Sequence, residues 1–445
     1  MPPGGDAARI KRPAAVGGMD FLSALPDELL RKVLSFLPSR QAVRTSVLAH
    51  RWRHEWKEVP SLRVTSSKGF QSENHLNKFI NHLLILRNRS LPFDVVDIKS
   101  YDSVWGFDLD EACRYIDVWI QHALNLKVQE LRVCITSYEI LEDEDTVYQW
   151  RLPNKLLTSE HLTKLELIRV ELKDHSLDFS SCPVLKYLKM EFCNLLVNRI
   201  VSPSIKHLII TCCGFKPEAR TRISAPSLIS LQLVDCRERT PFLESMPLLV
   251  SAFVRLRNCC DCCANSYETG DCGDDSCEGC TGSNIGKNTC VLLQSLSGST
   301  NLELTAETAV FILRKDLTRC PVFSKLKTLL LNDWCITANL GPLISFLQHS
   351  PNLEKLTLQL PEIPEDLKGT GGSYDINKQP FLSKRLTVEV KCHKPDERVR
   401  KILGVLCSCG IPPEQIKILQ LPKQIKSRCK KPWPPGSLSF EQKRT

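Results

Sequence analysis

The chain has 445 residues, of which 42% are hydrophobic, and its 59 basic and 50 acidic side chains give a formal charge of +9. This length exceeds that of one ordinary domain, and the apolar content is sufficient for a large core. Because no segment reaches the ~18 consecutive apolar residues of a membrane-spanning helix, we expect no membrane partner. The N-terminal residues also lack the apolar core of a secretory signal, so we expect the chain in the nucleus and/or the cytoplasm.

The charge is unevenly distributed along the chain. Residues 391–445 hold 13 basic and 4 acidic side chains, whereas residues 61–390 are net acidic. A body that binds nucleic acid normally carries a basic face, so we expect no nucleic-acid partner. In reducing compartments the 21 cysteines would remain thiols or metal ligands and would not form disulfides.

Residues 25–56 begin with the pattern of a short amphipathic helix. Pro26 lacks an N–H, which the first helical turn would leave unpaired, and the two acidic residues after it suit the positive end of the helix dipole. Pro38 ends this helix. Apolar residues recur along one stripe of it, namely Leu29, Leu30, Val33, Leu34 and Leu37.

A second and a third helix are predicted next. Ser39 can cap the second helix, and Trp52 and Trp56, which are four residues apart, would lie on one face of the third. Three helices of this size form a single small core, and domains below ~40 residues are rarely stable alone. The block has more apolar residues than such a core needs, so we expect another surface to cover them.

The block "LPDELLRKVLSFLPSRQAVRTSVLAHRWRHEW" resembles an F-box, in the plant form that opens with Leu-Pro and closes with "TSVL" and two tryptophans. The resemblance implies that the helices dock on a Skp-type adaptor, which bridges to a cullin–RING ubiquitin ligase. The surplus apolar face would then be an interface. The alternative is a plain helical subdomain packed on the rest of the chain. The resemblance implies that the following residues form or support the docking surface: Leu25, Pro26, Leu29, Leu30, Val33, Leu34, Leu37, Pro38, Val47, Leu48, Trp52 and Trp56.

A phrase with apolar residues at offsets 0, 3 and 5 recurs through the body of the chain, often after a proline. Successive copies are 23, 20, 23 and 21 residues apart, within the ~20–29 residues of leucine-rich repeats. This period predicts short parallel strands stacked into a curved solenoid whose concave face binds protein. The alternative is an ordinary α/β domain. The copies lie at 161–167, 184–190, 204–210, 227–233, 325–331 and 352–358, with weaker ones at 127–133, 248–254 and 299–304.

Three cysteines occupy the same position in successive repeats. Cys193, Cys213 and Cys236 lie eight residues after the first apolar position, where the leucine-rich-repeat signature has Asn or Cys. The pattern resembles the cysteine-bearing repeat of plant or ligase-adaptor proteins. This resemblance implies that the three thiols are buried turn residues and not catalysts.

A cysteine-rich insert, residues 258–295, interrupts the repeats. Eight cysteines lie in it, and two Cys-x-x-Cys pairs among them could bind tetrahedral zinc through four thiolates. The 13 residues between the pairs contain Gly and Asp and lack the apolar pattern of a strand, so we expect an exposed loop without a cofactor. Zinc stays open as the alternative. The four candidate ligands are Cys260, Cys263, Cys277 and Cys280.

Residues 385–421 are predicted to form a strand, a helix and a second strand. "LTVEV" alternates, Asp396 can cap the helix, Gly410 and Pro412 end it, and "QIKIL" is the returning strand. The segment resembles the FBD-type segment that follows the repeats of many plant F-box proteins, and it would cap the open edge of the solenoid. The basic, Pro-rich end is expected to be a disordered tail, with nuclear import as a further hypothesis.

The predicted fold class is therefore α/β, with a small three-helix F-box, a leucine-rich-repeat solenoid and a strand-helix-strand cap. We expect a non-catalytic receptor for an unidentified protein substrate, because no Gly-rich phosphate loop, Gly-x-Ser-x-Gly or His-Glu-x-x-His motif occurs. The alternative function is a leucine-rich-repeat scaffold that acts outside a ligase. The expected divisions are 1–20 (disordered basic tail), 21–62 (F-box), 63–120 (linker of helix and strand), 121–375 (repeats), 376–425 (FBD-like cap) and 426–445 (basic tail).

Overall fold

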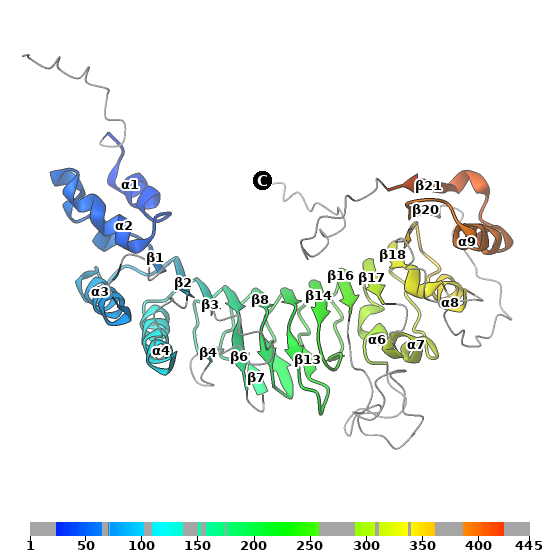
Figure 1. The fold of residues 1–445 in the computed structure, drawn as a ribbon, viewed down its shortest axis with the longest axis horizontal. Helices are drawn as coiled ribbons and strands as arrows, with labels where there is room; N and C mark the ends of the chain where they lie inside the picture. The colour runs from blue at the N-terminus through cyan, green and yellow to red at the C-terminus, as the bar shows by residue number, and fades with distance from the viewer. Residues whose placement is uncertain are drawn as a thin grey trace, which may run out of the picture.

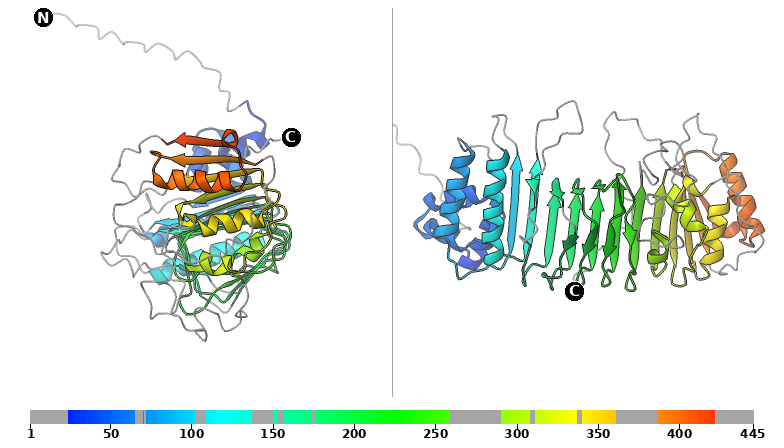
Figure 2. Two further views of the ribbon diagram at one scale, coloured as in Figure 1. Left: turned by 90° about the vertical axis from the view of Figure 1, so that its right-hand side faces the viewer. Right: turned by 90° about the horizontal axis from the view of Figure 1, so that it is seen from below.

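The computed structural model describes residues 24–64, 70, 72–101, 109–136, 150–152, 157–173, 176–257, 290–307, 311–336, 340–360 and 386–421. In this part of the chain, 13 parallel strands form one long sheet that bends into an arc, with the strands in chain order (Figure 1). The long sheet lines the inner side of the arc. Helices and two four-stranded sheets lie on its outer side (Figures 1 and 2). The fold is thus mixed α/β with parallel sheets.

Most strands of the long sheet bury alternate side chains against the outer layer, whereas the last strand, β21, buries none. In β5, Leu165 and Leu167 are fully buried, whereas Lys164 and Glu166 point to the inner side and are partly exposed. The strands are β1 (Ser61–Val64), β2 (Val95–Tyr101), β3 (Glu130–Thr136), β5 (Lys164–Ile168), β8 (Tyr187–Glu191), β11 (His207–Thr211), β14 (Ser230–Cys236), β16 (Ser251–Leu256), β17 (Asn301–Ala306), β18 (Thr328–Asn332), β19 (Lys355–Leu360), β20 (Thr387–Cys392) and β21 (Ile416–Gln420).

The recurring apolar phrase coincides with these strands, as predicted. Leu165, Leu188, Leu208 and Leu231 stand directly opposite one another on β5, β8, β11 and β14, and each is at most 1% exposed. Residues at the same position of successive sequence copies therefore lie side by side on neighbouring strands. The long sheet also includes β1 and β2, so it begins at Ser61, well before the first recognisable copy of the phrase.

A left-handed residue follows each of three consecutive strands of the middle region, β5, β8 and β11, and a fourth lies within the next strand, β14, at a shift of its register. Arg169, Phe192, Cys212 and Asp235 have φ angles of 50–57° although none is glycine. Such a conformation costs roughly 1–2 kcal/mol for a residue with a Cβ. A hydrogen bond to the next repeat offsets this cost: the N–H of Phe192 donates to Thr211 O at 3.0 Å, and that of Cys212 donates to Val234 O at 2.8 Å. The same conformation therefore recurs because each copy is held by its successor.

Directly after three of these left-handed residues lie the repeated cysteines. Cys193, Cys213 and Cys236 are at most 3% exposed. Their sulfurs donate to backbone carbonyls of the preceding strand, at 3.4 Å to Leu167 O, 3.5 Å to Met190 O and 3.8 Å to Ile210 O, respectively. The predicted burial is confirmed for all three, but Cys236 is the last residue of β14, whereas Cys193 and Cys213 lie between strands.

The outer layer changes along the arc. In the middle it consists of two sheets of very short strands, and toward the ends it consists of helices (Figure 1). One short sheet contains β4 (Trp150–Arg151), β6 (Val170–Leu172), β9 (Asn194–Leu195) and β12 (Gly214–Phe215); the other contains β7 (Ser176–Asp178), β10 (Arg199–Val201), β13 (Arg222–Ser224) and β15 (Phe242–Leu243). The helices of this layer are α3 (Glu73–Leu86), α4 (Leu109–Asn125), α6 (Leu293–Leu296), α7 (Phe311–Leu317), α8 (Gly341–His349) and α9 (Glu397–Ser408), with 3₁₀ turns η4 (Asp333–Cys335) and η5 (Pro413–Gln415).

The N-terminal block differs from its prediction in one element. It contains α1 (Asp27–Leu34) and α2 (Ser39–Arg44), as expected, but three 3₁₀ turns, η1 (Thr45–Val47), η2 (His50–Arg53) and η3 (Glu55–Glu58), replace the third helix. Trp52 packs in the core of this block, whereas Trp56 packs against the core of the long sheet. With about three residues per turn, positions four apart no longer share a face, so the two rings can serve different cores.

The C-terminal strand, helix and strand form as predicted. The Asp396 carboxylate accepts hydrogen bonds from the N–H groups of Arg398 and Val399 and so caps α9, and Gly410 follows the helix with a φ of 86°. β20 and β21 continue the parallel sheet as its last two strands, at the end away from the N-terminal module.

Candidate functional site

The N-terminal helices form a small module, residues 25–60, with a core of its own. Leu30 and Leu34 from α1 meet Ala42 from α2 and Trp52 from η2, and all are at most 7% exposed. The module is placed at one end of the arc (Figure 1). The apolar side chains of the module that do not belong to this core lie on its surface.

Five large apolar side chains of this module face solvent, with exposures from 43% for Val33 to 84% for Val47. They come from α1, from the turn that follows it and from the η1 region. Leu29, Val33 and Phe36 follow one another at helical spacing, and exposed apolar side chains grouped in this way mark an interaction site. We call this set the apolar face; it consists of Leu29, Val33, Phe36, Val47 and Leu48.

Most of the residues predicted for docking are accessible, but three are not. Leu30, Leu34 and Trp52 belong to the core of the module and can only support a docking surface. The others are exposed (Pro26, Leu29, Val33, Val47 and Leu48) or partly buried (Leu25, Leu37, Pro38 and Trp56).

Sequence reasoning missed Phe36, which is 68% exposed. It follows Val33 by three residues, so the helical period that selected Val33 already placed Phe36 on the same side.

Ion pairs hold the 3₁₀ turns against α1. The Arg31 guanidinium contacts Glu55 and Glu58 of η3, both at 2.7 Å, and Arg51 of η2 contacts Asp27 at 2.6 Å. The Glu55 contact, a hydrogen bond to the Arg31 side chain, raises the pKa of Arg31. These contacts fix the turns that carry Val47 and Leu48 relative to the helix that carries Leu29 and Val33.

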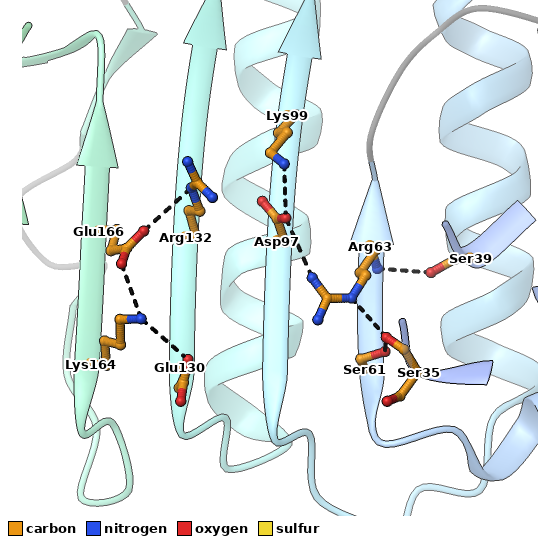
Figure 3. Close-up of polar contacts among 10 residues, drawn as sticks. All are labelled: Ser35, Ser39, Ser61, Arg63, Asp97, Lys99, Glu130, Arg132, Lys164 and Glu166. Atoms are coloured by element: carbon orange, nitrogen blue, oxygen red, sulfur yellow. Dashed lines mark hydrogen bonds and ion pairs between the residues drawn. The ribbon is translucent and has the colours of Figure 1, made fainter. Parts of the chain in front are cut away.

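Polar contacts fix the module onto the long sheet (Figure 3). The Ser61 hydroxyl of β1 donates to Ser35 O at 2.8 Å, and Arg63 Nε donates to the same carbonyl at 2.7 Å. The Arg63 N–H donates to the Ser39 hydroxyl at 2.8 Å, and its guanidinium lies 3.6 Å from Asp97 on β2. Because one side chain touches both the module and the second strand, the apolar face has a defined orientation relative to the sheet.

A buried arginine completes this junction. Arg87, which follows α3, is 5% exposed; its guanidinium donates to Val59 O and, at 2.9 Å, to Pro92 O, and lies 3.9 Å from the centre of the Phe93 ring. Burial lowers the pKa of Arg87 to about 10. Its hydrogen bonds to carbonyls join the end of the module to the start of β2.

The inner face of the long sheet is the second candidate surface. Near the module it is a mosaic of paired charges: Arg132 lies 3.3 Å from Glu166, and Lys164 bridges Glu130 at 3.6 Å and Glu166 at 3.1 Å (Figure 3). Further along, Lys189 lies 2.6 Å from Glu191. Neighbouring strands thus neutralise each other's charges on this part of the face.

Within the described ranges, no group of three or more His, Cys, Asp or Glu side chains could hold a metal ion. Cys260, Cys263, Cys277 and Cys280 lie outside the described residues. No described helix has both the length and the apolarity needed to cross a membrane.

An N-terminal helical module with an exposed apolar face, joined to a long parallel sheet, is the arrangement of a protein that binds other proteins. The F-box domain model matches residues 22–64, which include this module. An F-box protein of Arabidopsis thaliana is 30% identical over 235 residues, which cover 49% of this chain and 71% of the relative. The chain belongs to the F-box protein family.

Three further relatives extend the similarity into the sheet. F-box/LRR-repeat protein 13 of Arabidopsis thaliana is 28% identical over 389 residues, covering 80% of each chain. The MEIOTIC F-BOX protein MOF of Oryza sativa subsp. japonica is 27% identical, covering 76% of this chain and 71% of the relative. A putative FBD-associated F-box protein of Arabidopsis thaliana, 30% identical, covers half of each chain. These relatives indicate a substrate-receptor role in ligases of the Skp–cullin–F-box type, and an F-box implies binding to a Skp-type adaptor.

Proposed function

We propose that this protein is a non-catalytic substrate receptor of a Skp–cullin–F-box ubiquitin ligase. Its apolar face docks on the Skp-type adaptor, and the inner face of its long sheet binds the target protein. The observation that carries the proposal is the apolar face itself. Phe36 and Leu48 are 68% and 70% exposed on a module whose core is already complete.

We further propose that the long sheet is a leucine-rich-repeat solenoid. Support comes from the strands of equal phase, the recurrent left-handed residues and the three cysteines that bond to the preceding strand. Repeats of this kind present an extended inner surface, because each unit buries its apolar side against its neighbours and leaves the other side free. The outer layer of short strands and helices fills the buried side.

The junction around Arg63 would hold the adaptor-binding surface and the target-binding surface in a fixed relative position. A ligase receptor must hold its target at a defined place relative to the adaptor. Arg63 bonds to Ser35 in the module and contacts Asp97 in the sheet, so the two surfaces are parts of one continuous body. A target on the inner face would therefore be held in a fixed orientation relative to the adaptor.

Adaptor binding is the direct test. Full-length protein is co-expressed with a Skp-type adaptor, either unchanged or as the Phe36→Ser/Leu48→Ser variant. Exposed interface anchors commonly contribute about 2 kcal/mol or more, so we expect at least a ~30-fold loss of affinity. The matched control is Ile85→Ser/Leu86→Ser, since these residues of α3 are also large, apolar and more than half exposed.

The control should bind the adaptor normally, and both variants should keep the melting temperature of the parent because the changed side chains are exposed. Full adaptor binding by Phe36→Ser/Leu48→Ser would instead favour a repeat scaffold that acts outside a ligase. If the variant loses the adaptor as expected, ubiquitinated proteins that are enriched with the parent and not with the variant are targets that depend on the adaptor.

A further inference from the structure

A row of five side chains crosses the middle of the inner face, one from each of β11, β14, β16, β17 and β18. The parallel register places them opposite one another from strand to strand, and all are partly or fully exposed. We call this set the central row; it consists of Ile209, Gln232, Phe253, Glu303 and Leu330.

The central row differs from the charged mosaic next to the module. In the mosaic each acid has a cationic partner on its own or a neighbouring strand, as for Glu166 with Arg132 and Lys164. In the central row three of the five side chains are apolar, and one carries a charge. That charge is the Glu303 carboxylate, directly flanked by Phe253 on β16 and Leu330 on β18.

The Glu303 carboxylate has no hydrogen bond or ion pair to any residue of the described ranges. The cation on the neighbouring strand, Arg255, is already bound to Asp235 through two hydrogen bonds of 2.8 and 2.6 Å. Lys391 is three strands away on β20 and influences the Glu303 carboxylate only through long-range electrostatic attraction. Burial raises the pKa of Glu303, so the folded protein holds this carboxylate where water solvates it poorly. A cation brought to it from outside would recover the lost interaction.

We propose that the central row binds an extended segment of the target protein in which a lysine or arginine is flanked by apolar residues. The basic side chain meets the Glu303 carboxylate, and the apolar neighbours pack on Phe253 and Leu330. That the segment belongs to a ligase target rests on the proposed function. The preference for a basic residue between apolar ones rests on the central row alone. Strands lie ~4.8 Å apart, so the row spans about 19 Å, which is the length of about six extended residues.

The experiment selects short random peptides, displayed on phage, against the full-length protein bound to its adaptor. We expect peptides with one fixed Lys or Arg and apolar residues on both sides. Affinity of a selected peptide should fall at least about tenfold on Glu303→Gln, because the partner cation loses its counter-charge. The Glu303→Lys variant should select acidic peptides instead.

The matched control is Glu389→Gln. Glu389 lies on the same face, on β20, but its carboxylate is 2.9 Å from Lys355 and is therefore occupied. This variant should keep the parent's peptide preference. Glu303→Gln should melt at or above the parent temperature, since replacing the poorly solvated Glu303 carboxylate removes a cost of folding.

Several outcomes would overturn the proposal: peptides without a basic preference, equal losses for Glu303→Gln and Glu389→Gln, or tighter Glu303-dependent binding of a synthetic peptide of residues 422–445. The last result would identify the chain's own basic end as the occupant. Adaptor retention is measured in parallel. Loss of adaptor binding with an intact peptide preference would reject the ligase function alone. Intact adaptor binding without the peptide preference would reject this inference alone.

Discussion

Asp316, on α7, accepts a hydrogen bond from the backbone N–H of Leu292 at 2.8 Å. Its carboxylate also accepts the N–H groups of Val291, at 2.8 Å, and Leu293, at 2.9 Å, and the side chain is 1% exposed. These three N–H groups open α6, in the last part of the cysteine-rich insert, where the described residues resume at Cys290. Asp316 therefore anchors the point at which the repeats resume, across 24 residues of sequence.

We expect Asp316→Asn to destabilise the fold. An amide has one acceptor oxygen and can satisfy at most two of the three N–H groups, and a buried unsatisfied group costs about 1–3 kcal/mol. Urea unfolding followed by circular dichroism measures the change. The control is Asp178→Asn, because Asp178 accepts a single N–H, from Ser180, in an exposed turn. Equal stability of the two variants would contradict an anchoring role for Asp316.

The helix cap at Asp396 should make stability depend on pH. Burial opposes ionisation of Asp396, but the Arg398 guanidinium and the N–H groups of Arg398 and Val399 outweigh burial and lower its pKa below 3.8. A carboxyl whose pKa is lower in the folded than in the unfolded protein stabilises the fold at pH values above its unfolded pKa. This stabilisation is lost as the pH falls through its folded pKa. Asp396→Ala should thus cost about 1 kcal/mol near pH 7, and the difference should shrink below about pH 4.

Thermal unfolding of both proteins across this pH range measures the effect. Glu397→Ala is the control, because Glu397 pairs with Arg400 while both side chains are well exposed, and such pairs contribute little. A constant difference between parent and Asp396→Ala at all pH values would show that the charge of the cap plays no part.

The repeated cysteines should resist modification in the native protein. Cys193, Cys213 and Cys236 are buried, and burial also raises the pKa of the Cys213 thiol, which reduces its reactive thiolate. Cys407 on α9 is exposed and serves as the internal reference. Peptide mass spectrometry after brief labelling should find Cys407 modified first, and all four equally modified after denaturation. Native labelling of the three at the rate of Cys407 would reject the burial of these cysteines.

Removal of the cysteine-rich insert should leave the fold intact. Cys290 must be kept, because its sulfur donates to Arg319 O at 3.4 Å next to the Asp316 anchor. Residues 258–289 are therefore replaced by a short Gly/Ser linker. Loop length affects stability by only ~0.6 kcal/mol per doubling, so the melting temperature should change little.

Elemental analysis of the parent protein accompanies this deletion. We expect no zinc and an identical melt with and without a chelator. Stoichiometric zinc with a chelator-induced drop in melting temperature would assign the metal to the four candidate thiolates, because the free energy of binding a structural metal is part of the free energy of folding.

Much of the local structure could be predicted from the sequence, because short-range chemistry decides it. Pro26 and Asp396 begin helices through their own backbone and side-chain properties, and the alternation in "KLELI" selects a strand with one buried face. The third N-terminal helix failed for a long-range reason. Trp52 and Trp56 serve two different cores, and packing against both outweighed the helical period.

The sequence by itself thus determined the module, the strand phase and the burial of the repeated cysteines, since each depends on residues within one helical turn or one repeat. Only the tertiary structure decided that Leu30 is buried while Leu29 is 52% exposed, because the docking of η2 and η3 chooses which side of α1 is covered. It alone also isolates Glu303 between Phe253 and Leu330. Those residues are up to 77 positions apart in the chain, and only strand register, across an insert of irregular length, makes them neighbours.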